Sequence, residues 1–507
     1  MWNLHEELPI RSDSPVDKRK CVNTNQSKGN TMGTDYVINA DGSITEPSRK
    51  LDQIGRYDVI VAGGGPAGFG AAVAAARKGC KTLLIERESA LGGLATVGLV
   101  PIPLDMVCGI GKEMIQNLEA VNAHWHRNSD PEKHKLILDR MLKTSGADLL
   151  LATHIVESIV KDNRVCGVVV ESKSGRQVAL AERIIDCTGD ADVAYFSGCE
   201  CFEGRKEDGK HQACSLDFRL GGVNWEKYLD SDLKQNDAQW IKLIEKAVND
   251  GDLPYMIENH LNWITHVPGR PQHCGMDEVC ICISHSRNCN PLSARDLTRM
   301  YQEGREQADI FSQFIRKFIP GFENSYLIDT AGLLGVRESR RIVGEYVLKT
   351  LDFARGQQFD DAITSTSHHY DLHNPDGPGN IKWAKEIIDG KVCYVSSHGH
   401  PGSWMPPCGV ENMTDGWGRT GADRQFRSTP CDIPYRTLVP IKLDNLLVAG
   451  RCLSSEFMAQ AASRLIMTCL NMGQAAGTAM AQSLKENVVP RKIDVKTLQA
   501  TLAEDRK

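Results

Sequence analysis

The sequence lacks the charge excess that would attract nucleic acid or an acidic membrane surface. Its 507 residues carry a net charge of −6, and the pI is near 6.2. This balance offers no electrostatic attraction for polyanions, so we expect neither nucleic acid nor a membrane as a partner. The N-terminal stretch MWNLHEELPIRSDS contains acidic residues and no apolar segment. It is therefore not a secretory signal, and we expect a cytoplasmic protein.

Metal-binding motifs are missing as well. The 17 cysteines are scattered, and the closest group, Cys274, Cys280, Cys282 and Cys289, contains no CxxC spacing. Such spacing matches neither a zinc ribbon nor a ferredoxin cluster. No HExxH pattern joins the histidines either. We expect free thiols in a reducing compartment and no metal site.

The uncharged run at residues 59–76 has the length of a membrane span but the pattern of a binding turn. Glycines and a proline interrupt the run at positions 63–66, a β-rich segment (58–62) precedes them, and an alanine-rich segment follows. Alanine favours helix, so the pattern predicts a strand, a tight turn and a helix.

Three glycines of this turn have the spacing GxGxxG. Gly63 permits the sharp turn, Gly65 lets a pyrophosphate approach the backbone, and Gly68 lets the helix pack closely on the strand. The start of the helix, with Pro66 and Ala67, offers free amides to phosphates. The pattern predicts a dinucleotide site, with an ordinary glycine-rich turn as the alternative.

Three further predicted strands end in residues suited to a ligand. These residues are Glu86, Thr188, Gly189, Asp190 and Gly450. An acidic side chain at Glu86 can accept hydrogen bonds from a ribose diol, and ligands of α/β proteins bind at the carboxyl ends of strands. Because Gly450 follows a long middle region, we expect the nucleotide domain to be discontinuous, with that region inserted into it.

From about residue 45 to 483 the chain resembles a known family. The opening glycine unit, ALGGLAT, DCTGDADVA, LLGVRESRRIVGEYVL and the stretch from IPYRTLVP to GQAAGTA are similar to the FAD-dependent oxidoreductases of the glutathione reductase-like superfamily. More narrowly they resemble the bacterial family called FAD-dependent oxidoreductase, which is distantly similar to the fumarate reductase flavoprotein and the thiazole-forming flavoproteins. The resemblance implies FAD as cofactor and an α/β fold: a Rossmann-like FAD-binding domain with a discontinuous, central parallel sheet, and an inserted α+β substrate or cap domain.

We expect five regions along the chain. They are a partly flexible N-terminal arm (1–50), the first part of the FAD-binding domain (51–200), a substrate or cap domain with long loops (201–430), the second part of the FAD-binding domain (431–485) and a C-terminal tail (486–507). Within the cap domain, residues 297–318 have apolar side chains at helical spacing and predict an amphipathic helix.

The resemblance also implies which residues bind FAD. They are Gly63, Gly65, Pro66, Ala67, Gly68, Glu86, Arg87, Gly93, Thr96, Val156, Thr188, Gly189, Asp190, Gly450, Arg451 and Arg464. A helix beginning near Arg464 would aim its N-terminus at the flavin pyrimidine, where helix amides and the guanidinium stabilise negative charge. Surface ion pairs are the alternative for Arg451 and Arg464.

Proton transfer beside a flavin needs a histidine, tyrosine, arginine or carboxylate. The candidates are His373 in YDLHNPDG, where Asp371 could orient the imidazole, His398 and His400 in SHGHPGSW, and Arg337 in RESRR. An exposed loop is the alternative for His398 and His400. A surface salt-bridge ladder at helical spacing is the alternative for Arg337.

These features together predict an FAD-dependent oxidoreductase that transfers a hydride between the flavin and a small polar molecule bearing hydroxyls or carboxylates, sugar-like molecules included. One alternative is a reductase of activated C=C bonds fed by an external electron donor; the other is an electron-transfer flavoprotein subunit acting with a protein partner. Only one GxGxxG unit is convincing, so we do not expect direct use of NAD(P)H. The sequence leaves open an electron-donor or acceptor partner, a homo-oligomer and a covalent flavin link.

Overall fold

The computed structural model describes residues 36–234, 237–258, 261, 263–269, 276–368, 371–378, 383–388, 391–396, 404–405 and 430–507. The chain divides into two units, Met1–Leu51 and Asp52–Lys507. In the described part of the first unit, β1 (Val37–Ile38) pairs with β2 (Ile44–Thr45) in an antiparallel hairpin.

The second unit is built on a seven-stranded, mostly parallel sheet. Its strands are β3 (Asp52–Ala62), β4 (Thr82–Ile85), β7 (Asp148–Leu150), β8 (His154–Lys161), β9 (Arg164–Ser172), β10 (Gly175–Asp186) and β22 (Leu446–Val448). Their order is β7-β4-β3-β10-β9-β8, and β22 pairs with β10. The last residues of β10 pair in parallel with β22, and its first half pairs antiparallel with β9. A strand from the end of the chain thus completes a sheet that begins near residue 52.

The central strands are apolar because both of their faces are covered. Val59 and Val61 of β3 face one hydrophobic core, and Ile60 and Ala62 face the other; all four are fully buried. Parallel strands covered on both faces have continuous apolar sequences, which is why the run around β3 resembled a membrane span. In the part of the chain that the structure describes, no helix combines the length and the apolar composition needed to cross a membrane.

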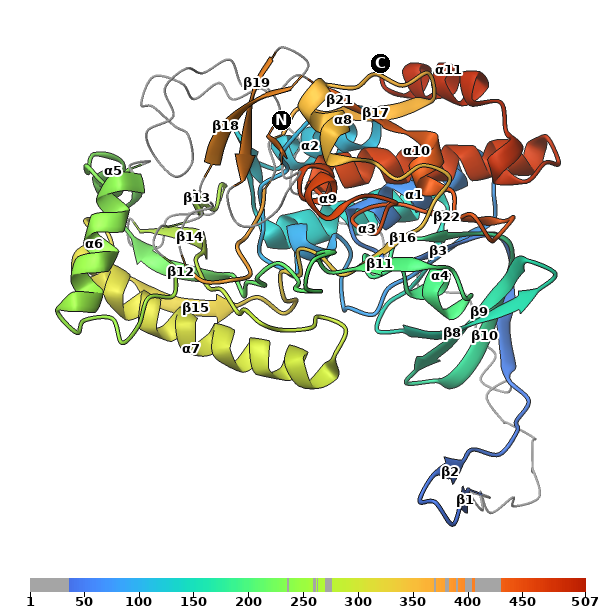
Figure 1. Cartoon of the computed structure of the whole chain (residues 1–507), viewed down its shortest axis with the longest axis horizontal. Coiled ribbons are helices and arrows are strands. Elements are labelled where there is room, and N and C mark those ends of the chain that lie inside the picture. The colour runs from blue at the N-terminus through green and yellow to red at the C-terminus, as the bar shows by residue number, and fades with distance from the viewer. Residues whose placement is uncertain are drawn as a thin grey trace, which may run out of the picture. The chain divides into compact units, whose positions relative to one another are not determined.

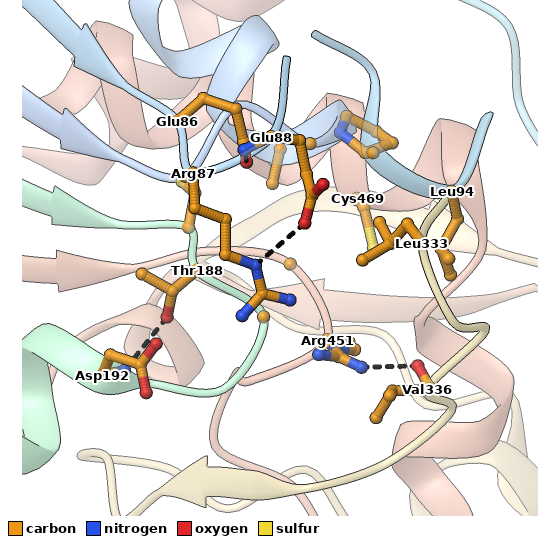
Figure 2. Close-up of a pocket in the computed structure, with 18 of the residues that line it drawn as sticks. Glu86, Arg87, Glu88, Leu94, Thr188, Asp192, Leu333, Val336, Arg451 and Cys469 are labelled. Carbon is orange, nitrogen blue, oxygen red and sulfur yellow. Dashed lines mark hydrogen bonds and ion pairs between the residues drawn. The ribbon is translucent and has the colours of Figure 1, made fainter. Parts of the chain in front are cut away.

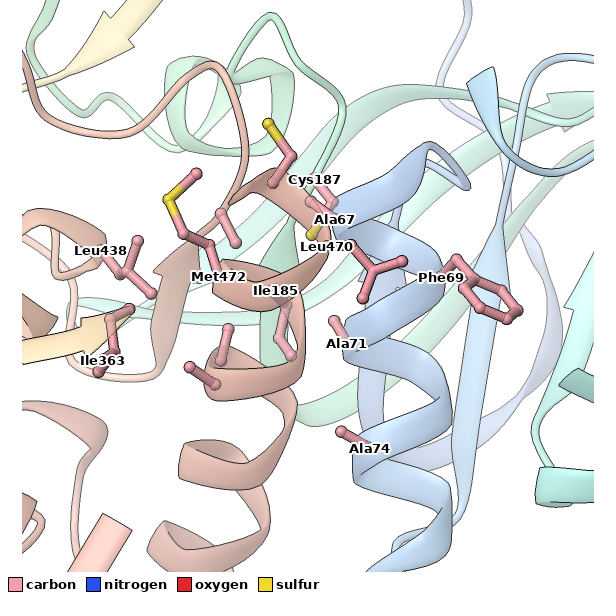
Figure 3. Close-up of a cluster of buried hydrophobic side chains, with 14 of the residues drawn as sticks. Ala67, Phe69, Ala71, Ala74, Ile185, Cys187, Ile363, Leu438, Leu470 and Met472 are labelled. Carbon is pink, nitrogen blue, oxygen red and sulfur yellow. The ribbon is translucent and has the colours of Figure 1, made fainter. Parts of the chain in front are cut away.

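Helices α1 (Pro66–Arg77) and α10 (Ile466–Lys485) lie side by side over the first of these cores, with α2 (Gly109–Ala120) and α3 (Pro131–Ser145) nearby (Figure 1). The backbones of α1 and α10 approach very closely. A Cβ atom at Gly473 would lie 1.9 Å from the Ala67 carbonyl oxygen, and one at Gly477 would lie 2.2 Å from that of Ala71. Figure 3 shows this crossing, with Ala67 and Ala71 of α1 beside Leu470 of α10.

A second, antiparallel sheet is inserted between β10 and β22. It consists of β12 (Phe218–Val223), β13 (Trp263–His266), β14 (Asp277–Cys282) and β15 (Tyr326–Thr330), in the order β13-β14-β12-β15. Helices α5 (Trp225–Leu229), α6 (Asp237–Asn249) and α7 (Ala294–Phe318) accompany it. Helix α7 confirms the amphipathic helix predicted over 297–318, and its Phe311, Phe314 and Ile315 are buried in the core of this part.

The remaining elements connect these two parts or extend them. They are η1 (Gly93–Ala95), β5 (His124–Trp125), β6 (Asn128–Ser129), α4 (Asp192–Phe196), β11 (Cys201–Glu203), β16 (Arg340–Ile342), α8 (Thr350–Arg355), β17 (Ala362–Thr366), β18 (Trp383–Ile388), β19 (Lys391–Ser396), β20 (Trp404–Met405), β21 (Cys431–Pro434), η2 (Tyr435–Leu438), α9 (Phe457–Ser463), η3 (Pro490–Lys492) and α11 (Val495–Asp505). The expected C-terminal tail contains α11, whose Leu498 and Leu502 are buried in the first core. The predicted class is confirmed: an α/β fold with a central, mostly parallel sheet and an inserted domain.

Candidate functional site

A cavity lies at the carboxyl ends of the parallel strands (Figure 2). The segments that follow all five of these strands contribute to its wall. They supply Gly63, Gly65, Pro66 and Ala67 after β3; Glu86, Arg87 and Glu88 after β4; Thr153, His154 and Ile155 after β7; Cys187, Thr188 and Gly189 after β10; and Ala449, Gly450 and Arg451 after β22. The strands are parallel, so their ends meet at one edge of the sheet and form a single site.

The three glycines of the first turn differ in what surrounds them. Gly63 has φ +90°, and a Cβ there would lie 2.5 Å from the Cys187 carbonyl oxygen. A Cβ at Gly68 would lie 1.7 Å from the Gly63 carbonyl oxygen, so Gly68 serves the close packing of helix on strand. A Cβ at Gly65 would meet no protein atom within 4 Å. The absence of a side chain at Gly65 therefore keeps space open for a ligand.

Helix α1 begins at this open space. Its N-cap residue, Gly65, provides no side-chain hydrogen bond, and Pro66 occupies the first turn. The amides of an uncapped first turn are suited to phosphate oxygens. The turn, the open space and the helix start together fit the pyrophosphate of a dinucleotide.

Glu86 holds this turn to the end of β4. Its Oε2 accepts a hydrogen bond from the Gly64 amide at 2.5 Å, and its Oε1 accepts one from the Glu88 amide at 2.8 Å. Each carboxylate oxygen can accept a second hydrogen bond, so Glu86 can still bind a ribose hydroxyl. The predicted contact with the ribose stays a prediction.

Arg451 lies in the wall of the cavity and not in a surface ion pair. Its Nη2 donates to Asp190 Oδ1 at 2.6 Å, and its Nη1 donates to the Val336 carbonyl, a contact drawn in Figure 2. Asp192 lies in the same wall, and burial, with Asp190 and Asp186 close by, raises its pKa to about 6. Arg87, Arg451 and Asp192 therefore form a mixed-charge surface beside the glycine turn.

Four predicted cofactor-binding residues do not line the cavity: Gly68, Thr96, Val156 and Asp190. The Thr96 hydroxyl donates to the Leu91 carbonyl and supports the turn that contains Gly93, which does line the cavity. Val156 lies at a register shift in β8, and its neighbour Ile155 lines the cavity in its place. For these four residues, direct contact with a cofactor stays a prediction.

The apolar part of the wall was not predicted from the sequence. Leu333, Leu334 and Val336, between β15 and β16, line the cavity, and so do Ile466 and Cys469 of α10. Isolated apolar residues in a connecting segment have no periodicity that distinguishes a cavity wall from a core. Only their position over the strand ends identifies them.

Arg464 lies between two helices and lines the cavity. It is the C-cap residue of α9, and α10 begins two residues later at Ile466. This confirms the helix start predicted near Arg464 and brings the first turn of α10 to the cavity. Arg464 does not form a surface pair: 11% of its side chain is exposed, and its Nη2 donates to Asp371 Oδ2 at 2.9 Å.

Behind Asp371 the structure brings two histidines together. Asp371 Oδ1 lies 3.2 Å from Nε2 of His373, and Nδ1 of His373 lies 2.8 Å from Nε2 of His285. The predicted pairing of Asp371 with His373 is present, but His373 does not line the cavity. His285 was not a candidate, because a single histidine after β14 has no motif around it.

Arg337 is also buried next to the cavity. Only 8% of its surface is exposed, and its Nη1 donates to the Ala213 carbonyl at 2.8 Å and to Ser215 Oγ at 2.9 Å. The alternative of a surface salt-bridge ladder on a helix is wrong. Residues 337–339 precede the strand β16, and the fully buried Glu338 pairs with Arg341 inside the protein.

Burial and charge have opposite effects on the pKa of Asp371, but they act in the same direction on the two histidines. Burial favours a neutral Asp371, but Arg464 and His373 outweigh it and hold the pKa of that carboxyl well below its usual range. Burial, together with the charge of Arg337, lowers the pKa of His373 to about 3. Burial and the neighbouring His373 lower the pKa of His285 well below its ordinary value. Both imidazoles are therefore neutral at pH 7. His398 and His400 lie outside the described residues.

Comparison with known proteins gives a family match and partial relatives. Residues 58–502 match the family model described as FAD dependent oxidoreductase. The chain is 31% identical over 157 residues to the tRNA uridine 5-carboxymethylaminomethyl modification enzyme MnmG of Geotalea uraniireducens, which covers 26% of this chain and 24% of that protein. It is 31% identical over 150 residues to the thiamine thiazole synthase of Methanococcus vannielii, which covers 27% of this chain and 58% of that protein. The matches thus span less than two thirds of the length of either relative.

Among solved structures, the chain is similar to a geranylgeranyl bacteriochlorophyll reductase-like protein from Thermoplasma acidophilum. The sequence identity is 14% and the TM-score is 0.42, with 89% of this chain and 82% of that chain covered.

Proposed function

The chain belongs to the FAD dependent oxidoreductase family, whose cofactor is FAD, and from this premise we propose that it transfers a hydride between FAD and a small polar organic molecule. FAD, when bound, supplies the site that accepts or donates the electron pair. The protein contributes binding, orientation, the exclusion of water and a place for the proton.

The glycine turn and α1 would hold the dinucleotide part of FAD. Gly63, Gly65 and the first-turn amides of α1 would bind the pyrophosphate, and Glu86 would bind the adenosine ribose. The open space at Gly65 supports this assignment, since a side chain there would fill the cradle without contacting the protein. The start of α10, with Arg464, would stabilise negative charge at the other end of the cofactor.

The substrate class rests on one observation: the charges of two arginines act on a single carboxylate, Asp371, beside the cavity. Arg464 lines the cavity, Arg337 is buried next to it, and the positive charges of both lower the pKa of Asp371 between them. Such an excess of positive charge in a poorly hydrated site favours an anionic or hydroxyl-rich molecule over an apolar one. We propose a substrate that bears carboxylates or hydroxyls.

The apolar wall would keep water from the reacting atoms. Leu333, Leu334 and Val336 on one segment and Ile466 on α10 offer no hydrogen-bonding side chains. A poorly hydrated site strengthens the electrostatic contacts of Arg464 with a bound anion.

The proposal is tested with the absorbance spectrum of the purified full-length protein, before and after denaturation, followed by an anaerobic screen. We expect flavin bands, and bleaching of these bands by members of a panel of hydroxy acids, dicarboxylates and sugars. A colourless protein that cannot be reconstituted with FAD would overturn the proposal. Reoxidation of the chemically reduced protein by an activated alkene, with no bleaching by the panel, would replace it with the alternative reductase.

A matched pair of variants tests the role of Arg464. Arg464→Met is expected to raise KM for an anionic substrate by about tenfold or more, because a charge-assisted hydrogen bond is lost. Arg219→Met removes an arginine of the inserted sheet that pairs with Asp329 and whose side chain is 8% exposed, against 11% for Arg464, and should leave KM unchanged. Equal effects of the two substitutions would contradict a direct role for Arg464.

A further inference from the structure

His285 and His373 form a direct contact between two buried imidazoles. They come from separate segments, one after β14 and the other beyond β17, and their exposed fractions are 4% and 8%. The ring planes are inclined by 28°, the ring centroids are 5.1 Å apart, and the facing nitrogens are 2.8 Å apart, so the rings meet edge to edge. This distance is that of a hydrogen bond, so one proton must lie between the two rings.

The pair ends in an acceptor on each side. Nδ1 of His285 lies 2.9 Å from the Ile283 carbonyl oxygen, and Nε2 of His373 lies 3.2 Å from Asp371 Oδ1. A carbonyl oxygen and an ionised carboxylate can only accept hydrogen bonds, so each of these contacts also needs a proton on the imidazole.

Three contacts therefore need three protons, but two neutral imidazoles carry only two. If His285 donates to Ile283 and His373 donates to His285, then the lone pair of His373 Nε2 faces Asp371. If both protons shift by one position, His373 donates to Asp371, and the lone pair of His285 Nδ1 faces Ile283. One additional proton satisfies all three contacts in either arrangement.

Charged groups from several elements surround the pair and keep this third proton away. The positive ones are Arg337, Arg464 and Arg287, and the negative ones are Asp371 and Glu258, whose Oε2 lies 3.9 Å from His285 Nε2. Glu258 pairs with Arg287 and Asp371 pairs with Arg464, whereas no carboxylate of the described residues forms an ion pair with Arg337, whose charge also acts on the buried Asp217. Negative charge added to the cavity would offset the arginines and raise the affinity of the pair for a proton.

We propose that His285 and His373 act as a pair that accepts one proton when FAD in the cavity is reduced, with Asp371 and Arg464 connecting the pair to the cavity. This inference rests on the proposed function. In the oxidation of a substrate alcohol, the C–H bond breaks with its electron pair going to FAD, and the O–H bond breaks with its proton released. One N–H bond forms on the imidazole pair. Because His285 acts through His373, it is a positioning residue.

The pH dependence of the two-electron reduction potential of bound FAD tests the proposal without any substrate. In the wild-type holoenzyme, equilibrated anaerobically with redox dyes, we expect a slope steeper by about one proton per two electrons than in His285→Phe or His373→Phe. A residue that only supports the fold would shift the potential at every pH without changing this slope. Equal slopes in the wild type and both variants would overturn the proposal.

His266→Phe is the matched control. Nε2 of His266 lies 3.0 Å from Asp277, so it is also a histidine–carboxylate pair of the inserted domain, but it does not line the cavity. In His266→Phe, the slope of the FAD reduction potential against pH should equal that of the wild type.

A second measurement needs neither FAD nor a stable variant. In wild-type protein with ¹⁵N-labelled histidine, the shared proton predicts a scalar coupling between two ring nitrogens across the N–H···N hydrogen bond at neutral pH. Its absence would overturn the pair itself. Failure to bind FAD or to find a substrate would overturn the proposed function, whereas this coupling would still be present.

Discussion

Arg464 donates two hydrogen bonds to Asp371, one to its carbonyl oxygen at 2.7 Å and one to its Oδ2 at 2.9 Å. Arg464 lines the cavity and Asp371 contacts His373, so this single pair connects the cavity to the buried histidines. The connection joins a helix start at residue 466 to a segment about 90 residues earlier in the chain.

The pair should contribute to stability in a pH-dependent way. The folded pKa of Asp371 lies below its unfolded value of about 3.9, so its contribution is fully present above that pH and is lost as the pH falls through the folded value. We expect the free energy of unfolding of the wild type to fall more steeply below about pH 4 than that of Asp371→Asn. Urea unfolding at a series of pH values measures this, and parallel pH profiles would contradict it.

Two substitutions in the glycine turn should affect different properties, one the binding of FAD and the other the folding of the protein. Gly65→Ala should fold with a loss of about 0.5–1 kcal/mol and bind FAD at least about tenfold more weakly, because the new methyl group meets only the ligand space. Gly63→Ala should fail to fold well, because φ is +90° and the Cβ would lie 2.5 Å from a carbonyl oxygen. Thermal unfolding and fluorescence titration with FAD separate the two effects. Unchanged FAD affinity in Gly65→Ala would exclude the turn as the phosphate site.

Binding of FAD should weaken as the pH rises through the titration of Asp192. Its pKa of about 6 means that it becomes ionised between about pH 5 and 7, and a carboxylate in the cavity wall repels phosphates. We expect the Kd for FAD to rise on the order of severalfold over this range in the wild type and to stay constant in Asp192→Asn. Asp139→Asn is the control, since burial also raises the pKa of Asp139 but this residue lies on α3 and does not line the cavity. A pH profile that Asp192→Asn leaves unchanged would contradict the assignment.

The close crossing of α1 and α10 should tolerate no side chain at Gly473. An alanine Cβ would lie 1.9 Å from the Ala67 carbonyl oxygen, so the helices must separate, at a cost of about 3 kcal/mol or more. Gly111→Ala on α2 is the control, because its Cβ would meet the flexible end of Met467 and alanine favours helix by up to about 1 kcal/mol. Denaturant unfolding of the two variants checks this, and equal stabilities would show that the crossing can relax.

Local patterns allowed much of the fold to be predicted. The glycines at 63 and 65, the strand before them and the alanine-rich helix after them are all determined by the conformations open to consecutive residues. The start of α10 was also predicted, and α7 was predicted from its spacing of apolar residues. Residues 486–507 were expected to be a C-terminal tail, but they contain α11, which packs on the core. This packing depends on residues that are distant in the chain.

The sequence by itself determined where the backbone can turn sharply and where a helix can begin beside a ligand, since these properties depend on residues adjacent in the chain. Only the tertiary structure decided which side chains meet. His285 and His373 are 88 residues apart, and Arg337 is buried although its neighbours suggested a surface ladder. Burial and contact depend on how distant segments pack, and this packing also sets the charge and the hydrogen bonding of the candidate site.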